Sequence, residues 1–144
     1  MIYTEKTKKA MEICFEAHKK QTDKSGIPYV FHPIHLAEQM TTEETTIVAL
    51  LHDVVEDSDI TFEYLENEGF DKAIIDAIKL LTHKDKTVKY HDYVRKIKDN
   101  PIAKAVKLAD LAHNSDITRL DVVTEKDLKR RQKYLEAIEI LNEE

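Results

Sequence analysis

The chain has 144 residues, a length typical of one domain with a substantial core. Hydrophobic residues make up 42% and charged residues 35%, which is typical of a globular protein and excludes a disordered one. Because the formal net charge is −6, the field of the whole molecule does not attract nucleic acid or an anionic membrane, and we expect neither as a partner. The N-terminus has no signal-peptide form, so the expected compartment is a reducing cytoplasm.

Helical periodicity recurs along the chain, and strand-like alternation is nowhere sustained. A first helix is expected from about Thr4 to His18, followed by a polar loop over residues 22–29. Pro33 suits the first turn of a second helix. Thr41 and Glu44 are spaced as a capping box and predict the start of a third helix.

Five further helices are indicated by N-cap residues, first-turn prolines or apolar faces. They begin after Thr61, after Asp71, near Tyr90, at Asn100-Pro101 and after Thr124. Gly69 is a natural end for the first of them. The sequence therefore predicts an all-α fold, with one domain over residues 1–144 and about seven or eight helices. The single cysteine, Cys14, lies at an apolar helical position and is expected in the core.

The third predicted helix leads from an apolar run into His52 and Asp53, and then into Glu56 and Asp57. Asp53, Glu56 and Asp57 are spaced i, i+3 and i+4, so their carboxylates share a helix face and repel one another. The dipole at a helix C-terminus adds to this cost, and a bound cation would remove it. The alternative is a helix that ends at Val55 and leaves Glu56 and Asp57 pointing into water.

Asp110 and His32 are further candidate ligands. Asp110 lies four residues after Val106 in an otherwise apolar helix, so its carboxylate must be protonated, paired or metal-bound. An ion pair with an internal lysine or arginine is the alternative. Together with His52 and Asp53, these residues offer two imidazoles and two carboxylates, a set that suits Mn²⁺, Fe²⁺ or Zn²⁺. The lack of thiolates argues against structural zinc.

Five residues are candidates for contact with a nucleotide: Lys24, Lys84, Tyr90, Lys107 and Asn114. Ammonium and amide donors suit phosphate or ribose oxygens, and a tyrosine ring can stack on a base. Each has an ordinary alternative. The lysines can be solvated or, for Lys107, paired with a carboxylate; Asn114 can cap a helix, and Tyr90 can be half core.

Two histidines lie close in sequence to these candidates. His18 is expected to support the metal site without binding the metal. His113, three residues after Asp110, can be a spare imidazole or a ligand of a second metal, and we favour the first interpretation.

The ordered set of motifs resembles the HD superfamily of metal-dependent phosphohydrolases, and more closely the hydrolase domain of the RelA/SpoT family with its small stand-alone relatives. The resemblance covers roughly residues 13–120. It is carried by Ala17-His18, Gln21, residues 25–33 (SGIPYVFHP), residues 51–58 (LHDVVEDS), Leu81-Thr82, residues 106–110 (VKLAD) and His113-Asn114. The ordered set is much more specific than any dipeptide within it.

The resemblance implies one bound metal ion, with Mn²⁺ expected and Fe²⁺, Zn²⁺ or Mg²⁺ as alternatives. The implied ligands are His32, His52, Asp53 and Asp110. It implies that Glu56 and Asp57 position and activate the attacking water, and that the substrate is guanosine 3′,5′-bis(diphosphate), cleaved at its 3′-pyrophosphate. The alternatives are a non-catalytic nucleotide sensor, an HD phosphohydrolase for another nucleotide and a structural adaptor. The oligomeric state is not implied.

Two positions depart from the family pattern. Asp23 stands where the family usually has an arginine that packs on the guanine base, and Leu111 stands where it often has arginine or lysine. Both departures are expected on the substrate side of the site. A carboxylate at position 23 cannot stack on a purine, so we expect weaker selection for guanine than in the relatives that have arginine there, mainly as a difference in KM.

Overall fold

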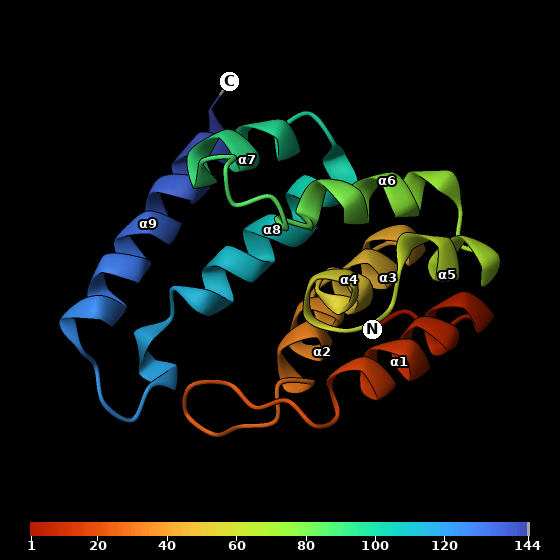
Figure 1. The fold of residues 1–144 in the computed structure, drawn as a ribbon, viewed down its shortest axis with the longest axis horizontal. Coiled ribbons are helices and arrows are strands. Elements are labelled where there is room, and N and C mark those ends of the chain that lie inside the picture. The colour runs from red at the N-terminus through yellow and green to blue at the C-terminus, as the bar shows by residue number, and fades with distance from the viewer. Residues whose placement is uncertain (144) are drawn as a thin grey trace.

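The computed structural model describes residues 1–143, which form nine α-helices and one short 3₁₀ helix (Figure 1). The helices are α1 (Glu5–His18), α2 (Phe31–Glu38), α3 (Glu43–Leu51), α4 (Val54–Asp57), α5 (Phe62–Asn67), α6 (Lys72–Leu81), α7 (Tyr90–Ile97), α8 (Pro101–Asn114), η1 (Ile117–Arg119) and α9 (Glu125–Asn142). The predicted all-α fold is confirmed. The count exceeds seven or eight because the predicted third helix is divided at His52 and Asp53.

Helix α3 forms the centre of the fold. Every residue from Thr46 to Leu51 is buried, and the helix packs against α1, α2, α6 and α8. A helix covered on several faces must be apolar nearly all round, which explains the unbroken apolar run in the sequence. Helix α9 packs against α7 and α8 and closes one side of the molecule (Figure 1).

Most predicted helix boundaries coincide with side-chain caps. Cap hydrogen bonds are made by Thr4, Thr61, Asn100 and Thr124, and Gly69 adopts φ = 90° just after α5. The predicted Thr41–Glu44 capping box is wrong by one residue, because Thr42 caps α3 by accepting the Thr45 N–H at 3.1 Å. Asp71 occupies the cap position of α6 without a side-chain cap bond.

The helical path is interrupted where the candidate ligands begin. Helix α3 ends at Leu51, and Asp53 takes the N-cap position of the single-turn helix α4 without a side-chain cap bond. The Asp53 carboxylate is therefore free to face the site. Glu56 and Asp57 lie in the one turn of α4, so the sequence-based argument from the dipole of a long helix is wrong.

The polar loop before α2 lies beside the segment that follows α8, at one edge of the molecule (Figure 1). Thr22 and Pro28 form an isolated antiparallel bridge, and Gly26 turns the loop with φ = 79°, where glycine is favoured because it lacks Cβ. The Ser25 hydroxyl donates to the Arg119 carbonyl at 3.4 Å. Within residues 1–143, no helix combines the length and apolarity that crossing a membrane requires.

Candidate metal centre and substrate cleft

The four candidate metal ligands converge from α2, the α3–α4 junction and α8. His32 Nε2 lies 2.9 Å from Asp110 Oδ1, and His52 Nε2 lies 3.7 Å from the same oxygen. His52 Nε2 is also 3.1 Å from Asp53 Oδ2. One ligand atom from each of His32, His52 and Asp53 lies within 4.8 Å of the other two. Such a cluster fits a divalent metal ion.

His52 provides a test of whether the residues suit a cation. Its Nδ1 lies 2.7 Å from the Ala49 carbonyl, which requires a proton on Nδ1, so the neutral ring has its lone pair on Nε2. Among the described residues, this buried Nε2 has no hydrogen-bond partner, although it faces two carboxylates. A lone pair directed at carboxylates is repelled unless a positive charge lies between them, so the donor set fits a cation.

The ionisation of the same group gives a consistent answer. Burial opposes protonation of His52, but the charges of Asp53 and Asp110 outweigh it and raise the pKa of His52 well above its usual value. Burial also disfavours the charged form of Asp53, which by itself would raise the pKa of this carboxyl. The charge of His52 outweighs that effect and lowers the pKa of Asp53 to about 2. The pocket therefore requires positive charge, supplied either by a proton or by a metal ion.

Three other side chains hold the carboxylates in place. The Tyr29 hydroxyl donates to Asp53 Oδ2. Lys107 Nζ lies 3.0 Å from Asp110 Oδ2, and Asn114 Nδ2 donates to Asp110 Oδ1 at 2.9 Å. Asp110 therefore forms the ion pair that was the alternative interpretation and also faces the histidines. One of its carboxylate oxygens contacts Lys107, and the other faces the cluster.

The acidic pair lies next to Asp53. One carboxylate oxygen from each of Asp53, Glu56 and Asp57 lies within 4.8 Å of the others. Glu56 is not simply solvated, because its Oε1 accepts the His83 N–H at 2.7 Å. Asp57 is open to solvent on one side, but the partial desolvation of its carboxyl, followed by the charges of Asp53 and Glu56, raises its pKa to about 6. This raised pKa favours proton uptake by Asp57.

A cleft of about 390 Å³ opens on these carboxylates. It is lined by Tyr29, Asp53, Glu56, Asp57, Leu81, His83, Lys86, Tyr90, Tyr93, Lys107, Asp110, Asn114, Lys133 and Tyr134. The predicted substrate residues Tyr90, Lys107 and Asn114 are therefore here, whereas the exposed Lys84 is not. Sequence analysis missed Lys86 and Lys133. Lys86 is only two residues from the predicted Lys84, in a charged stretch that was a signal for it, but only tertiary packing brings Lys133 from α9 to the cleft.

A second cavity, of about 440 Å³, adjoins the cleft and shares Tyr29, Asn114 and Tyr134 with it. The predicted Lys24 lines this cavity together with Arg119. The expectation that Leu111 faces the substrate is wrong. Its side chain is 1% exposed and belongs to the core, which explains why a charged residue is not suited to that position in this chain.

His18 and His113, the two further histidines singled out in the sequence, contact residues of the site. His18 Nδ1 lies 2.7 Å from Gln21 Oε1, and its ring meets the Tyr29 ring edge-on at 4.9 Å. His113 Nδ1 lies 2.7 Å from His32 Nδ1. Among the described residues, His113 does not belong to a group of three or more side chains with metal-ligand spacing, so the second-metal interpretation gains no support.

The fold and this cluster define an HD-type hydrolase domain. No model of a known protein family matches the chain. A guanosine-3′,5′-bis(diphosphate) 3′-pyrophosphohydrolase of Aquifex aeolicus is 30% identical to this chain. The alignment covers 96% of this chain and 21% of that protein. The protein of the same name in Borreliella burgdorferi is 37% identical, in an alignment that covers 74% of this chain and 18% of that protein. The bifunctional (p)ppGpp synthase/hydrolase SpoT of Escherichia coli is 32% identical over 74% of the chain and 17% of its own length.

Among solved structures, a metazoan ortholog of SpoT that hydrolyses ppGpp superimposes with a TM-score of 0.77 over 99% of this chain and 88% of that one, at 24% identity. That likeness shows the fold. The chain spans about a fifth of the length of the curated relatives it matches. It is therefore an HD-type domain related to the RelA/SpoT family.

Proposed function

We propose that this chain is a metal-dependent hydrolase that removes the 3′-pyrophosphate of guanosine 3′,5′-bis(diphosphate), the nucleotide in the names of its relatives. The observation that carries the proposal is the buried Nε2 of His52, which lacks a partner among residues 1–143 and faces the carboxylates of Asp53 and Asp110. The proposed ligands are His32, His52, Asp53 and Asp110. Two imidazoles with two carboxylates favour Mn²⁺ as the ion, with Fe²⁺, Zn²⁺ or Mg²⁺ as alternatives.

A cation held by these ligands supplies Lewis-acid chemistry, polarising phosphoryl oxygens and lowering the pKa of water. Asp57 and Glu56 line the same cleft as Asp53 and are assigned to orient the attacking water and accept its proton. The His83 N–H fixes the Glu56 carboxylate for this role. Water attacks the phosphorus bonded to the ribose 3′ oxygen, and the bond between that phosphorus and the 3′ oxygen breaks. The 3′ oxygen takes up a proton, so the products are guanosine 5′-diphosphate and pyrophosphate.

The basic side chains of the cleft are assigned to the pyrophosphate group. Lys86, Lys107 and Lys133 line the cleft and can donate charged hydrogen bonds to phosphate oxygens, which the net charge of −6 does not otherwise attract. Lys133 Nζ lies 4.3 Å from the centre of the Tyr90 ring, so these two side chains form one wall. Lys24 and Asn114 line the adjoining cavity, which we assign to the nucleoside.

The test uses protein stripped of metal by chelation. Wild type is expected to bind Mn²⁺ in calorimetric titration and then to release pyrophosphate, whereas Asp53→Ala is expected to do neither. Lys72→Ala, which removes only half of an exposed ion pair on α6, is the matched control and should keep both properties. Tight nucleotide binding without turnover in excess Mn²⁺ would instead identify a sensor.

A further inference from the structure

His113, in the last turn of α8, is joined edge to edge to the proposed metal ligand His32. Their Nδ1 atoms are 2.7 Å apart, their ring centres are 5.0 Å apart, and the rings are parallel to within 6°. Rings stacked face to face would hold their planes about 3.5 Å apart, the contact distance of carbon atoms. The nitrogens are too close for that arrangement. The two imidazoles therefore share a hydrogen bond that lies in the plane of both rings.

The position of the proton in this bond depends on the metal site. Nε2 of His32 faces Asp110 at 2.9 Å, on the side where the cation is assigned. A ring nitrogen that gives its lone pair to a cation carries no proton, so the proton of His32 must then be on Nδ1. Metal-binding histidines usually donate that second N–H to a carboxylate, a carbonyl or water. Here a neutral imidazole nitrogen of His113 occupies the acceptor position.

We propose that His113 is a positioning residue for the metal site: its Nδ1 accepts the Nδ1–H of His32 and so fixes the ring orientation and tautomer of that ligand. The inference rests on the metal site of the proposed function. It does not require His113 to touch the metal or the substrate.

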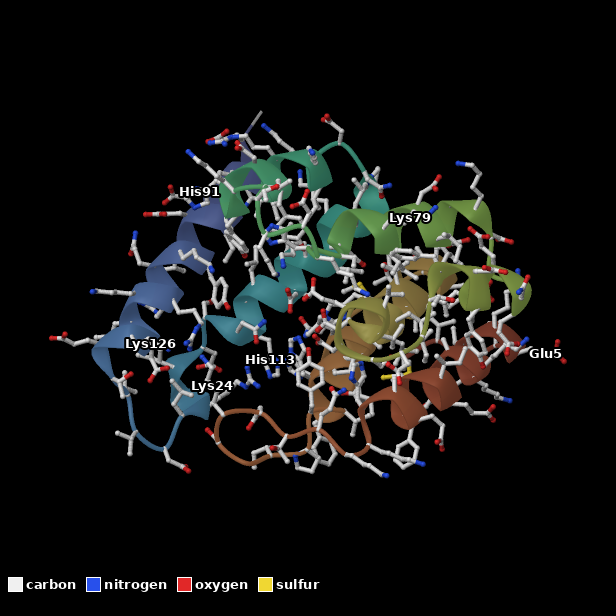
Figure 2. The ribbon with its side chains drawn as sticks, in the orientation of Figure 1. Glu5, Lys24, Lys79, His91, His113 and Lys126 are labelled. Atoms are coloured by element: carbon white, nitrogen blue, oxygen red, sulfur yellow. The ribbon has the colours of Figure 1, made fainter. Side chains whose placement is uncertain are left out.

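The surroundings of His113 support this role. Its backbone carbonyl accepts the Arg119 Nη1–H at 2.8 Å, which anchors the end of α8. The next residue, Asn114, donates to Asp110 at 2.9 Å. Consecutive residues thus hold two different proposed ligands. Figure 2 shows His113 well inside the outline of the molecule, whereas His91 lies near its edge.

The experiment measures the Kd for Mn²⁺ by calorimetry on metal-stripped protein, with the melting temperature of each metal-free variant recorded alongside. His113→Leu is expected to raise the Kd about 10- to 100-fold, the usual loss when such a partner is removed. His113→Asn should recover most of the affinity, because its amide oxygen can accept the His32 proton from nearly the same place. His35→Leu is the matched control, since His35 is exposed and its ring lies 4.2 Å from that of His113.

Two results would overturn the inference. One is a wild-type Kd in His113→Leu. The other is an equal loss in the Leu and Asn variants, which would mean that the shape of the ring matters and its acceptor nitrogen does not. If His113→Leu fails to fold, His113→Ala takes its place as the variant without an acceptor: a loss of affinity in His113→Ala with near-wild-type affinity in His113→Asn supports the acceptor role, and equal affinities in the two variants contradict it. Failure of wild type itself to bind Mn²⁺ would contradict the proposed function, which keeps the two failures distinct.

Discussion

The carboxylate of Asp23 pairs with the guanidinium of Arg119, with 3.6 Å between Oδ2 and Nη2, in the wall of the cavity assigned to the nucleoside. The other oxygen of Asp23 accepts the N–H groups of Ser25 and Ile27 at 2.9 and 3.0 Å. Asp23 therefore orders its loop and holds a guanidinium at the cavity. The sequence indicated only that a carboxylate replaces an arginine; the fold supplies a planar cation from η1.

This pair leads to a prediction about substrate affinity. Arg119→Gln should raise the KM for guanosine 3′,5′-bis(diphosphate) about tenfold, the order expected for one partly exposed charged hydrogen bond, and should change kcat little. Arg131→Gln, whose side chain lines neither cavity, is the control. Steady-state kinetics with guanosine and adenosine substrates also test whether selection for guanine is weaker than in relatives that have arginine at the position of Asp23. An unchanged KM in Arg119→Gln would remove Arg119 from substrate binding.

A second prediction concerns the ion pair of Lys107 and Asp110, whose side chains are 12% and 9% exposed. Lys107→Met should destabilise the metal-free protein by about 3 kcal/mol, because removing one partner leaves a buried charge. Added Mn²⁺ should restore part of this loss by binding the folded state. Denaturant titration with and without metal measures both effects. A loss no larger than that of Lys72→Met, at the exposed Lys72–Asp76 pair, would show that Asp110 does not need Lys107.

The acidic pair gives a third prediction. Asp57→Asn should lower kcat by about 10²- to 10⁴-fold, the usual contribution of a general base, while the Kd for Mn²⁺ stays close to that of wild type. Glu56→Gln keeps an acceptor for the His83 N–H and so should preserve the local fold while also slowing turnover. Glu63→Gln, at an exposed position of α5, is the control. Full activity in both acidic-pair variants would require another base.

Cys14 gives a fourth prediction, which tests the packing of the core. The thiol is 1% exposed, and burial followed by the charge of Asp53 raises its pKa to about 12. Because the thiolate is the reactive form, a maleimide should label folded protein far more slowly than urea-unfolded protein at neutral pH. Mass spectrometry follows the labelling of this single cysteine. Rapid labelling of the folded protein would contradict the described packing of α1.

The sequence predicted those features of the fold that depend on interactions between residues close along the chain. Caps at Thr4, Asn100 and Thr124 set helix starts, and apolar faces set the core, because both depend on residues close along the chain. The proposed ligands could also be selected from the sequence, since a carboxylate such as Asp110 in an apolar helix needs a partner. The break between α3 and α4 was missed, because residues 47–55 read equally well as one helix.

What could not be predicted depends on packing across the molecule. Lys133 reaches the cleft from α9, and Leu111 turns into the core because its helix face meets other helices. The contact between His113 and His32 joins residues 81 positions apart. Neither periodicity nor spacing along the chain carries such information, whereas the three-dimensional arrangement of the helices fixes it.

The most direct test of the central claim is the metal dependence of product formation. Metal-stripped protein is incubated with guanosine 3′,5′-bis(diphosphate), with and without Mn²⁺, and the nucleotide and phosphate products are separated by ion-exchange chromatography. We predict guanosine 5′-diphosphate and pyrophosphate in equal amounts, only with Mn²⁺, and neither from Asp110→Asn. Undiminished turnover in the stripped protein or in Asp110→Asn would contradict the account, as would the absence of turnover in Mn²⁺-loaded wild type.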